Sequence, residues 1–173
     1  MKLHKSALND VLWMEPELLI DARGFFAETY CENDWAKFSL VQCNISHNDK
    51  AQTLRGLHYQ KAPYQQDKYL TCTHGIIQDV IIDLREDSST YLKWDSFILS
   101  RENRQWLYIP KGFAHGYLTL TDDVDIFYQM SQFYEKDYEA GIRWDDPTFD
   151  IFWLKEPLII SERDQRHPDF KKD

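Results

Sequence analysis

A succession of short β-like segments, with no long amphipathic helix between them, most limits the fold of this chain. Apolar and aromatic residues cluster in brief runs that are separated by polar, turn-like residues. Short strands at such spacing favour a β-sandwich or a β-barrel. Two brief helices are also expected, over residues 33–38 and, capped by Ser161, near the C-terminus. The expected strands cover residues 11–14, 18–20, 24–30, 39–46, 53–60, 67–73, 76–84, 94–99, 106–109, 115–120 and 124–130.

The composition excludes several classes of partner. With 20 basic and 29 acidic residues the net charge is −9, which disfavours binding to a nucleic-acid backbone. An anionic ligand would have to be held by local Arg and Lys side chains, because charges beyond about 8 Å are largely screened at physiological salt. Three widely spaced cysteines are typical of a reducing compartment. No apolar run is long enough to span a bilayer, so a cytoplasmic protein without membrane partners is expected.

The clearest strand, residues 76–84, carries an acidic residue on an apolar face. Alternation places Ile77, Asp79 and Ile81 on one side and Ile76, Gln78, Val80 and Ile82 on the other. A carboxylate between two isoleucines must be paired or hydrogen-bonded, because burying it alone is too costly.

A histidine in the segment 53–60 offers a partner for this carboxylate. The imidazole of His58 can accept a proton near neutral pH, and Asp79 on a neighbouring strand could orient it. The segment 109–116, which contains His115, is expected to face His58 across one pocket. A His–Asp hydrogen bond that only joins two strands remains the alternative interpretation.

Two Arg-Gly pairs suggest that guanidinium groups are aimed at a ligand. Arg55 lies three residues before His58, so strict alternation would send the two to opposite faces. A β-bulge at Gly56 would bring both to the same side, and Gly24 could act likewise beside Arg23. Guanidinium groups bind phosphate in a bidentate manner, which makes both arginines candidates for a diphosphate. Surface salt bridges are the alternative for both.

Other chemistry is less well supported. Tyr128 is a possible general acid, although a core aromatic is the simpler interpretation, and Lys68 by itself is interpreted as an exposed cation. The chain has no HxH or HExxH pair for a catalytic metal, no GxSxG elbow for acyl transfer, and no GxGxxG or P-loop for a nucleotide cofactor.

Taken together, six ordered motifs resemble the dTDP-4-dehydrorhamnose 3,5-epimerase family over residues 9 to 170. This resemblance implies one cupin-type (jelly-roll) domain over residues 1–173, mostly β with a few short peripheral helices, and no cofactor or metal. The motifs are Asp21-Ala-Arg23-Gly-Phe-Phe-Ala-Glu28, Gln42-Cys-Asn44-Ile-Ser46, Leu54-Arg55-Gly-Leu-His58-Tyr-Gln60, Asp79-Val-Ile-Ile-Asp83-Leu-Arg85, Ile109-Pro-Lys-Gly-Phe-Ala-His115-Gly and Gly141-Ile-Arg-Trp144-Asp-Asp-Pro.

The resemblance also implies roles for individual residues. His58 would be the general base with Asp79 as its partner, and Tyr128 the opposing general acid. Lys68 and Arg55 would stabilise the enolate oxygen and nearby charge. The matching positions that would bind substrate are Arg23, Phe26, Glu28, Gln42, Asn44, Arg55, His115, Tyr134 and Asp164.

The implied substrate is a nucleotide-diphosphate 4-keto sugar, inverted at C3, C5 or both, in a homodimer that exchanges N-terminal strands. Departures from the family pattern, such as Tyr69-Leu70-Thr71 after Lys68, leave the nucleotide (dTDP, GDP or CDP) and the inverted carbon open. The alternatives are a single-position epimerase, a 3,4-ketoisomerase on the same scaffold, a non-catalytic sugar-nucleotide binding module and, last, a metal-dependent oxygenase.

Overall fold

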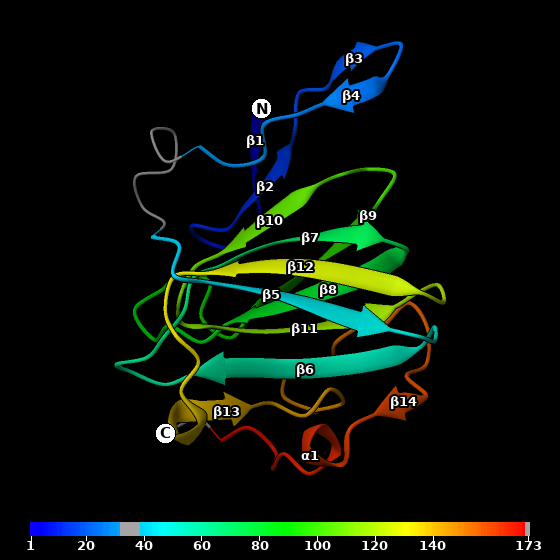
Figure 1. The fold of residues 1–173 in the computed structure, drawn as a ribbon. Coiled ribbons are helices and arrows are strands. Elements are labelled where there is room, and N and C mark those ends of the chain that lie inside the picture. Colours follow the sequence, from blue (N-terminus) through cyan, green and yellow to red (C-terminus); the bar gives the residue numbers. More distant parts are fainter. Residues whose placement is uncertain (32–38, 172–173) are drawn as a thin grey trace.

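Two antiparallel sheets stacked face to face make up the body of the molecule in a computed structural model, which describes residues 1–31 and 39–171 (Figure 1). The helix expected over residues 33–38 lies outside the described residues. The first sheet has the order β1 (Lys2–Lys5), β2 (Leu12–Glu15), β10 (Trp106–Ile109), β7 (Lys68–His74), β12 (Val124–Met130) and β5 (Gln42–Asn48). The second has the order β13 (Glu139–Gly141), β6 (Thr53–Gln60), β11 (Phe113–Thr119), β8 (Ile76–Asp83) and β9 (Trp94–Ser100), and β14 (Ile159–Ile160) pairs in parallel with β6.

Side chains from both sheets form the central core. Leu70 and Ile126 from the first sheet pack with Ile77, Ile81 and Tyr117 from the second. On the other face of β8, Val80 and Ile82 belong to a separate apolar cluster with Ile142 and Phe149 of the C-terminal segment. The alternation predicted for the strand 76–84 is therefore confirmed, and Asp79 is fully buried on the side of the central core.

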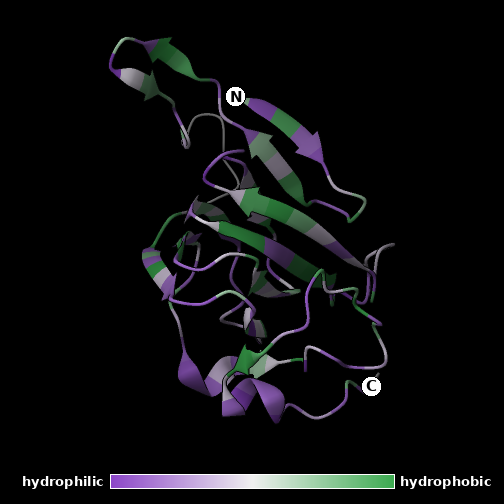
Figure 2. Ribbon diagram, turned by 90° about the vertical axis from the view of Figure 1, so that its right-hand side faces the viewer, coloured by the Kyte–Doolittle hydropathy of each residue, from purple (hydrophilic) through white to green (hydrophobic). Residues whose placement is uncertain are grey.

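A third, two-stranded sheet stands apart from the other two. The hairpin of β3 (Leu19–Asp21) and β4 (Gly24–Phe26) projects beyond the β1–β2 end of the first sheet, and much of it is hydrophobic (Figures 1 and 2). Its apolar side chains are largely exposed, up to 76% for Ile20 and 70% for Phe26. Exposure of this extent in a hairpin indicates a surface that another chain could cover.

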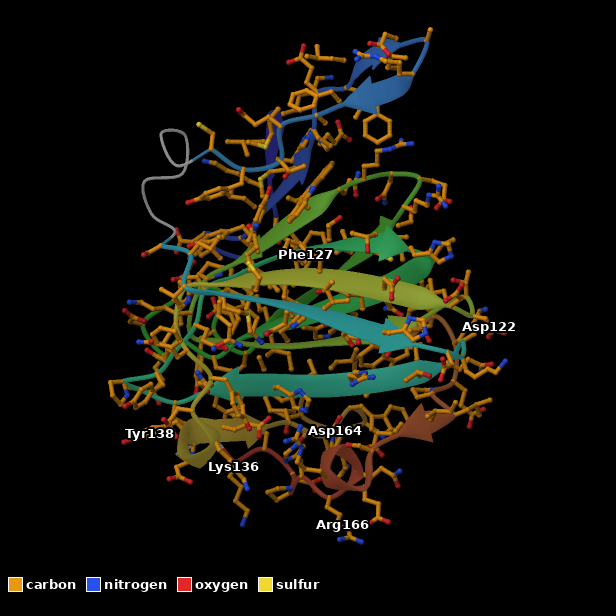
Figure 3. All side chains as sticks on the ribbon, in the orientation of Figure 1. Asp122, Phe127, Lys136, Tyr138, Asp164 and Arg166 are labelled. Atoms are coloured by element: carbon orange, nitrogen blue, oxygen red, sulfur yellow. The ribbon has the colours of Figure 1, made fainter. Side chains whose placement is uncertain are left out.

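Helical structure is confined to two short elements, the 3₁₀-helix η1 (Lys136–Tyr138) and the helix α1 (Glu162–Gln165). The predicted cap of the C-terminal helix is confirmed, since the Ser161 hydroxyl accepts a hydrogen bond from the backbone N–H of Asp164. This cap fixes α1 beneath β6, with Asp164 between the two (Figure 3). Among the described residues, no helix has both the length and the apolar character that crossing a bilayer requires.

Candidate active site

A cavity of about 310 Å³ opens between the two sheets and draws its walls from both. The first sheet contributes Lys68 from β7 and Tyr128 from β12, whereas the second contributes Arg55 and His58 from β6 and His115 from β11. The stretches around His58 and His115 thus line one pocket, as predicted, but from neighbouring strands of one sheet rather than facing each other across it. Its complete lining is Asn44, Ile45, Ser46, Arg55, His58, Tyr59, Gln60, Gln66, Lys68, His115, Tyr117, Tyr128, Met130, Tyr134, Glu139 and Arg163.

A β-bulge at Gly56 brings Arg55 and His58 to the same side of β6. The register pairs His115 with His58 but Tyr117 with Arg55, so that β6 holds one residue more than β11 between these pairs. Gly56 has a φ of +110°, a conformation that residues with a Cβ rarely adopt. The predicted bulge is confirmed.

Replacing Gly56 with Ala should lower the free energy of unfolding by about 2 kcal/mol or more. The new Cβ would combine the positive φ with 2.7 Å approaches to the Cα of Gly116 and the carbonyl oxygen of His115. Gly24→Ala is the matched control, because Gly24 has a φ of +126° but no atom within 4 Å of its Cβ position. Urea denaturation measures both variants, and equal losses would show that the close approach to β11 contributes nothing.

The partner of His58 differs from the one predicted. Asp79 does not contact His58: β11 lies between β6 and β8, so Asp79 instead meets His115, whose Nε2 is 2.8 Å from its Oδ2. The Nε2 of His58 lies 2.7 Å from Oδ1 of Asp164, a residue that the sequence had assigned to substrate binding. Asp164 is 3% exposed, and its Oδ2 accepts a hydrogen bond of 3.1 Å from the backbone N–H of Gly56.

The charge of Asp164 suits this position. Burial alone would raise the pKa of its carboxyl group, but the hydrogen bond and the charge of His58, together with the Gly56 N–H and Arg163, lower the pKa to about 2. A carboxylate that is ionised at neutral pH accepts the hydrogen bond of an Nε2–H group and so favours the proton on Nε2 of the neutral imidazole. The other ring nitrogen, Nδ1, is then available to accept a proton.

Asp79 and His115 form a second, more deeply buried pair. Burial raises the pKa of Asp79 and lowers the pKa of His115. The attraction between the two charged groups partly offsets both shifts. The negative charge of Asp79 also helps to retain the proton on Lys68.

Lys68 is buried, which corrects the interpretation of an exposed cation. Only 9% of the residue is accessible, and its ammonium group lies 3.4 Å from the backbone carbonyl oxygen of His58. Burial lowers the pKa of this lysine to about 8, although Asp79 and Glu139 oppose the shift. The ammonium group of this β7 residue therefore reaches the backbone of β6 at the cavity wall.

Tyr128 lies on the wall opposite His58. Burial, with a smaller contribution from Tyr117, raises the pKa of its phenol well above the usual value. The hydroxyl group is thus protonated at neutral pH and able to donate. The rings of Tyr128 and His115 meet edge to face, with centroids 6.2 Å apart.

The remaining predicted residues fall into two groups. Asn44 and Tyr134 line the cavity, and Gln42 hydrogen-bonds both: its side chain donates to Asn44 Oδ1 at 3.1 Å and accepts from the Tyr134 backbone at 3.2 Å. The residues on or beside the β3–β4 hairpin, by contrast, do not line the cavity of their own chain. These residues are Arg23, Phe26 and Glu28. The guanidinium group of Arg23 instead forms an ion pair with the carboxylate of Asp21, at 2.5 Å.

Sequence reasoning missed two charged residues of the cavity. Arg163 donates to Glu139 at 2.7 Å, and the same carboxylate oxygen accepts from the hydroxyl of Tyr134 at 2.9 Å. The sequence offered one signal for Arg163: the capping pattern at Ser161 predicts a helix that contains both Arg163 and its neighbour Asp164. This signal becomes informative only when the helix, α1, is known to lie beneath β6. With Arg55 and Lys68, Arg163 gives the pocket a local positive charge in an acidic protein.

Comparison with known proteins gives consistent results. The family profile described as dTDP-4-dehydrorhamnose 3,5-epimerase matches residues 5–172. The Escherichia coli protein of that name is 40% identical over 172 residues, which covers 96% of this chain and 92% of the relative.

Solved structures agree with this match. The dTDP-4-dehydrorhamnose 3,5-epimerase of Bacillus anthracis, with TDP and PPi bound, has a TM-score of 0.94 at 38% identity and covers 98% of this chain and 99% of its own. The dTDP-6-deoxy-D-glucose-3,5-epimerase of Legionella pneumophila, in complex with dTDP-4-keto-L-rhamnose, has a TM-score of 0.90 at 30% identity, covering 99% of both chains. The predicted cupin-type β fold is confirmed by these similarities.

Proposed function

Because the chain belongs to the dTDP-4-dehydrorhamnose 3,5-epimerase family and is an isomerase of that kind, we propose that it inverts C3 and C5 of a dTDP-linked 4-keto-6-deoxy sugar. The observation that carries the proposal is the placement of a His–Asp pair and a protonated phenol on opposite walls of one cavity. A base and an acid on opposite sides of a sugar ring are what inversion by proton transfer requires.

In the proposed reaction, Nδ1 of His58 removes the proton from a carbon next to the C4 ketone. Asp164 stabilises the imidazolium that forms, as in other His–Asp pairs. The electron pair moves onto the ketone oxygen to give an enolate, whose charge the Lys68 ammonium stabilises. Tyr128 then protonates the carbon from the opposite face, which inverts the centre.

The nucleotide part of the substrate is assigned to the positively charged mouth of the cavity. Arg55 is held by Asn48 and by the backbone of His47, so its guanidinium is pre-oriented for a diphosphate. Asn44 and Gln42 offer amide groups for the base. In this proposal, Arg23, Phe26 and Glu28 bind the nucleotide in the cavity of a second subunit.

A homodimer with exchange of N-terminal strands is therefore part of the proposal. It is supported by the exposed apolar side chains of the β3–β4 hairpin and by the finding that residues on or beside this hairpin do not line the cavity of their own chain. Sedimentation equilibrium should give a dimer for the full chain, and Arg23→Ala should raise KM more than it lowers kcat. A monomeric species with full activity would contradict this part.

A reducing, cytoplasmic setting is also proposed, supported by three cysteines that are all free.

The test of the function is deuterium exchange. The protein is incubated in deuterated water with dTDP-4-keto-6-deoxyglucose and, in parallel, with GDP- and CDP-linked 4-keto sugars. Incorporation at both C3 and C5 is expected with the dTDP sugar. Label at one carbon would indicate a single-position epimerase, a displaced carbonyl would indicate a 3,4-ketoisomerase, and no exchange with any sugar would refute the proposal.

Replacing Tyr128 with Phe should separate exchange from inversion. The base remains, so deuterium should still enter at the deprotonated carbon, whereas the rate of inverted product should fall by about 10²-fold. NMR reports label and configuration in one experiment. Tyr64→Phe, at a tyrosine that packs against Tyr138 outside the cavity lining, is the control and should retain inversion. Unchanged inversion in Tyr128→Phe would exclude the phenol as the acid.

A further inference from the structure

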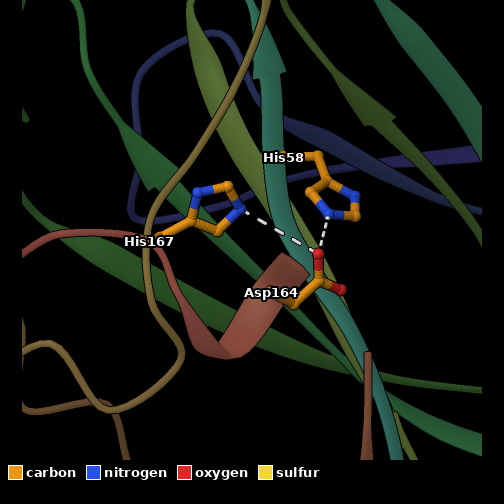
Figure 4. A group of neighbouring side chains, drawn as sticks. All are labelled: His58, Asp164 and His167. Carbon is orange, nitrogen blue, oxygen red and sulfur yellow. Dashed lines mark hydrogen bonds and ion pairs between the residues drawn. The ribbon is translucent and has the colours of Figure 1, made fainter. Parts of the chain in front are cut away.

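One histidine beside the His58–Asp164 pair has no role in the proposed reaction. His167 follows α1, and its ring nitrogen Nε2 points toward Asp164 Oδ1, the same oxygen that His58 contacts (Figure 4). The Nε2 atom is buried, and among the described residues no hydrogen-bond partner is available to it. A buried imidazole nitrogen without such a partner is unusual, which suggests that this atom is placed for a ligand.

The three side chains have the spacing of a metal site. Nε2 of His58 is 2.7 Å and Nε2 of His167 is 3.9 Å from the same oxygen of Asp164, and the three ligand atoms all lie within 4.8 Å of one another. Ligands bound at about 2.0–2.2 Å around a tetrahedral Zn²⁺ are separated by about 3.3 Å. Small rotations of the two rings and the carboxylate would reach that geometry.

The chemistry of the donors favours zinc or a similar divalent cation. Two imidazoles and one carboxylate, with a fourth position open, are a common ligand set of Zn²⁺. Asp164 supplies the carboxylate oxygen that the Nε2 atoms of both histidines face. The ring of His167 packs against Gly141, where there is no room for a Cβ.

We propose that His58, Asp164 and His167 bind one Zn²⁺ ion, and that this ion inhibits the enzyme. Zinc on Nε2 of His58 replaces the proton that Asp164 holds there, and this proton moves to Nδ1. The neutral, metal-bound imidazole then has no free electron pair and cannot deprotonate the sugar. Zinc binding itself is independent of the proposed function, whereas the inhibition rests on the role of His58 as the base.

Arg163 opposes the ion and sets its affinity. Its guanidinium lies 3.4 Å from Nε2 of His58 and 3.6 Å from Oδ1 of Asp164. The side chain is 57% exposed and is paired with Glu139, so it can turn outward when a cation arrives. Removing this positive charge with Arg163→Gln is expected to tighten zinc binding.

The experiment titrates chelator-treated protein with Zn²⁺ by calorimetry and with Co²⁺ by visible absorption, which reports tetrahedral coordination. One equivalent per chain is expected. His167→Gln and His167→Phe, the second of which keeps a ring against Gly141, should each weaken binding about tenfold or more. His47→Gln is the control, because His47 belongs to an exposed cluster with Asp49 and Asp125 and should leave the affinity unchanged.

Zinc should also stop deuterium exchange by the wild type, and a chelator should restore it, whereas both His167 variants should stay active at the same zinc concentration. Equal zinc affinity in the wild type and both His167 variants would overturn the site. Zinc bound through His167 without loss of exchange would overturn the inhibition. Metal-free protein that binds zinc but never exchanges deuterium would instead refute the epimerase proposal and leave the site intact.

Discussion

Replacing His58 with Asn should reduce deuterium incorporation at C3 and C5 by about 10²–10⁴-fold while the fold persists. The amide of Asn cannot take up a proton near neutral pH, so enolate formation loses its base. The side chain is 28% exposed at the cavity wall, so the substitution leaves no large void in the core. Exchange rates are measured by NMR on the 4-keto substrate, and circular dichroism checks the fold.

Asp164→Asn tests whether the pair acts as a unit. An amide in place of the carboxylate no longer stabilises the imidazolium, so a loss comparable to that of His58→Asn is expected. The double variant should be little worse than either single variant, because groups that act together are not additive. His74→Asn is the control, since this histidine is exposed near Asp123 and does not line the cavity. Full activity of either His58→Asn or Asp164→Asn would remove the pair from the mechanism.

The strand architecture could be predicted because the apolar alternation is strong where strands are half-buried. All expected strands after residue 38 have a counterpart, and β6 coincides with the predicted segment 53–60. By contrast, β1 was missed because Lys2–Lys5 alternates charges with little apolar signal. The elements β13 and β14 are three and two residues long, and they owe their extended form to pairing with β6 rather than to their own sequence.

The wrong partner for His58 has a topological cause. Sequence reasoning recognised that Asp79 must be paired, which the 2.8 Å contact with His115 confirms. The sequence alone could not establish which strand lies between β6 and β8. That strand is β11, which comes much later in the chain than either. The true partner of His58 comes from a four-residue helix 106 positions away, a contact that no local pattern encodes.

The location of Lys68 was likewise hidden from the sequence. The residue begins β7, where a lysine is ordinarily exposed, and only the stacking of the two sheets encloses it. Its depressed pKa is therefore a tertiary effect, caused by loss of solvent around the ammonium group. This buried cation leads to the second large expected effect.

Lys68→Met should lower kcat about 10²–10³-fold, as expected for removal of one group that stabilises a developing oxyanion. The pH dependence identifies the group. Because the pKa of Lys68 is about 8 in the free protein, below the usual 10.5, the ammonium is charged at lower pH and is lost as the pH rises through 8. The kcat/KM of the wild type should therefore fall on the alkaline side of pH 8.

The fall of kcat/KM above pH 8 distinguishes an electrostatic role of Lys68 from a structural one. Lys68→Arg keeps the positive charge at any pH that the protein tolerates, so the fall above pH 8 should disappear while part of the activity returns. Lys68→Met should show a low and flat profile over the same range. If the fall near pH 8 survives in both variants, another group causes it. If Lys68→Met also keeps its kcat, Lys68 does not stabilise the enolate, and Arg55 and Arg163, which also line the cavity, become the candidates.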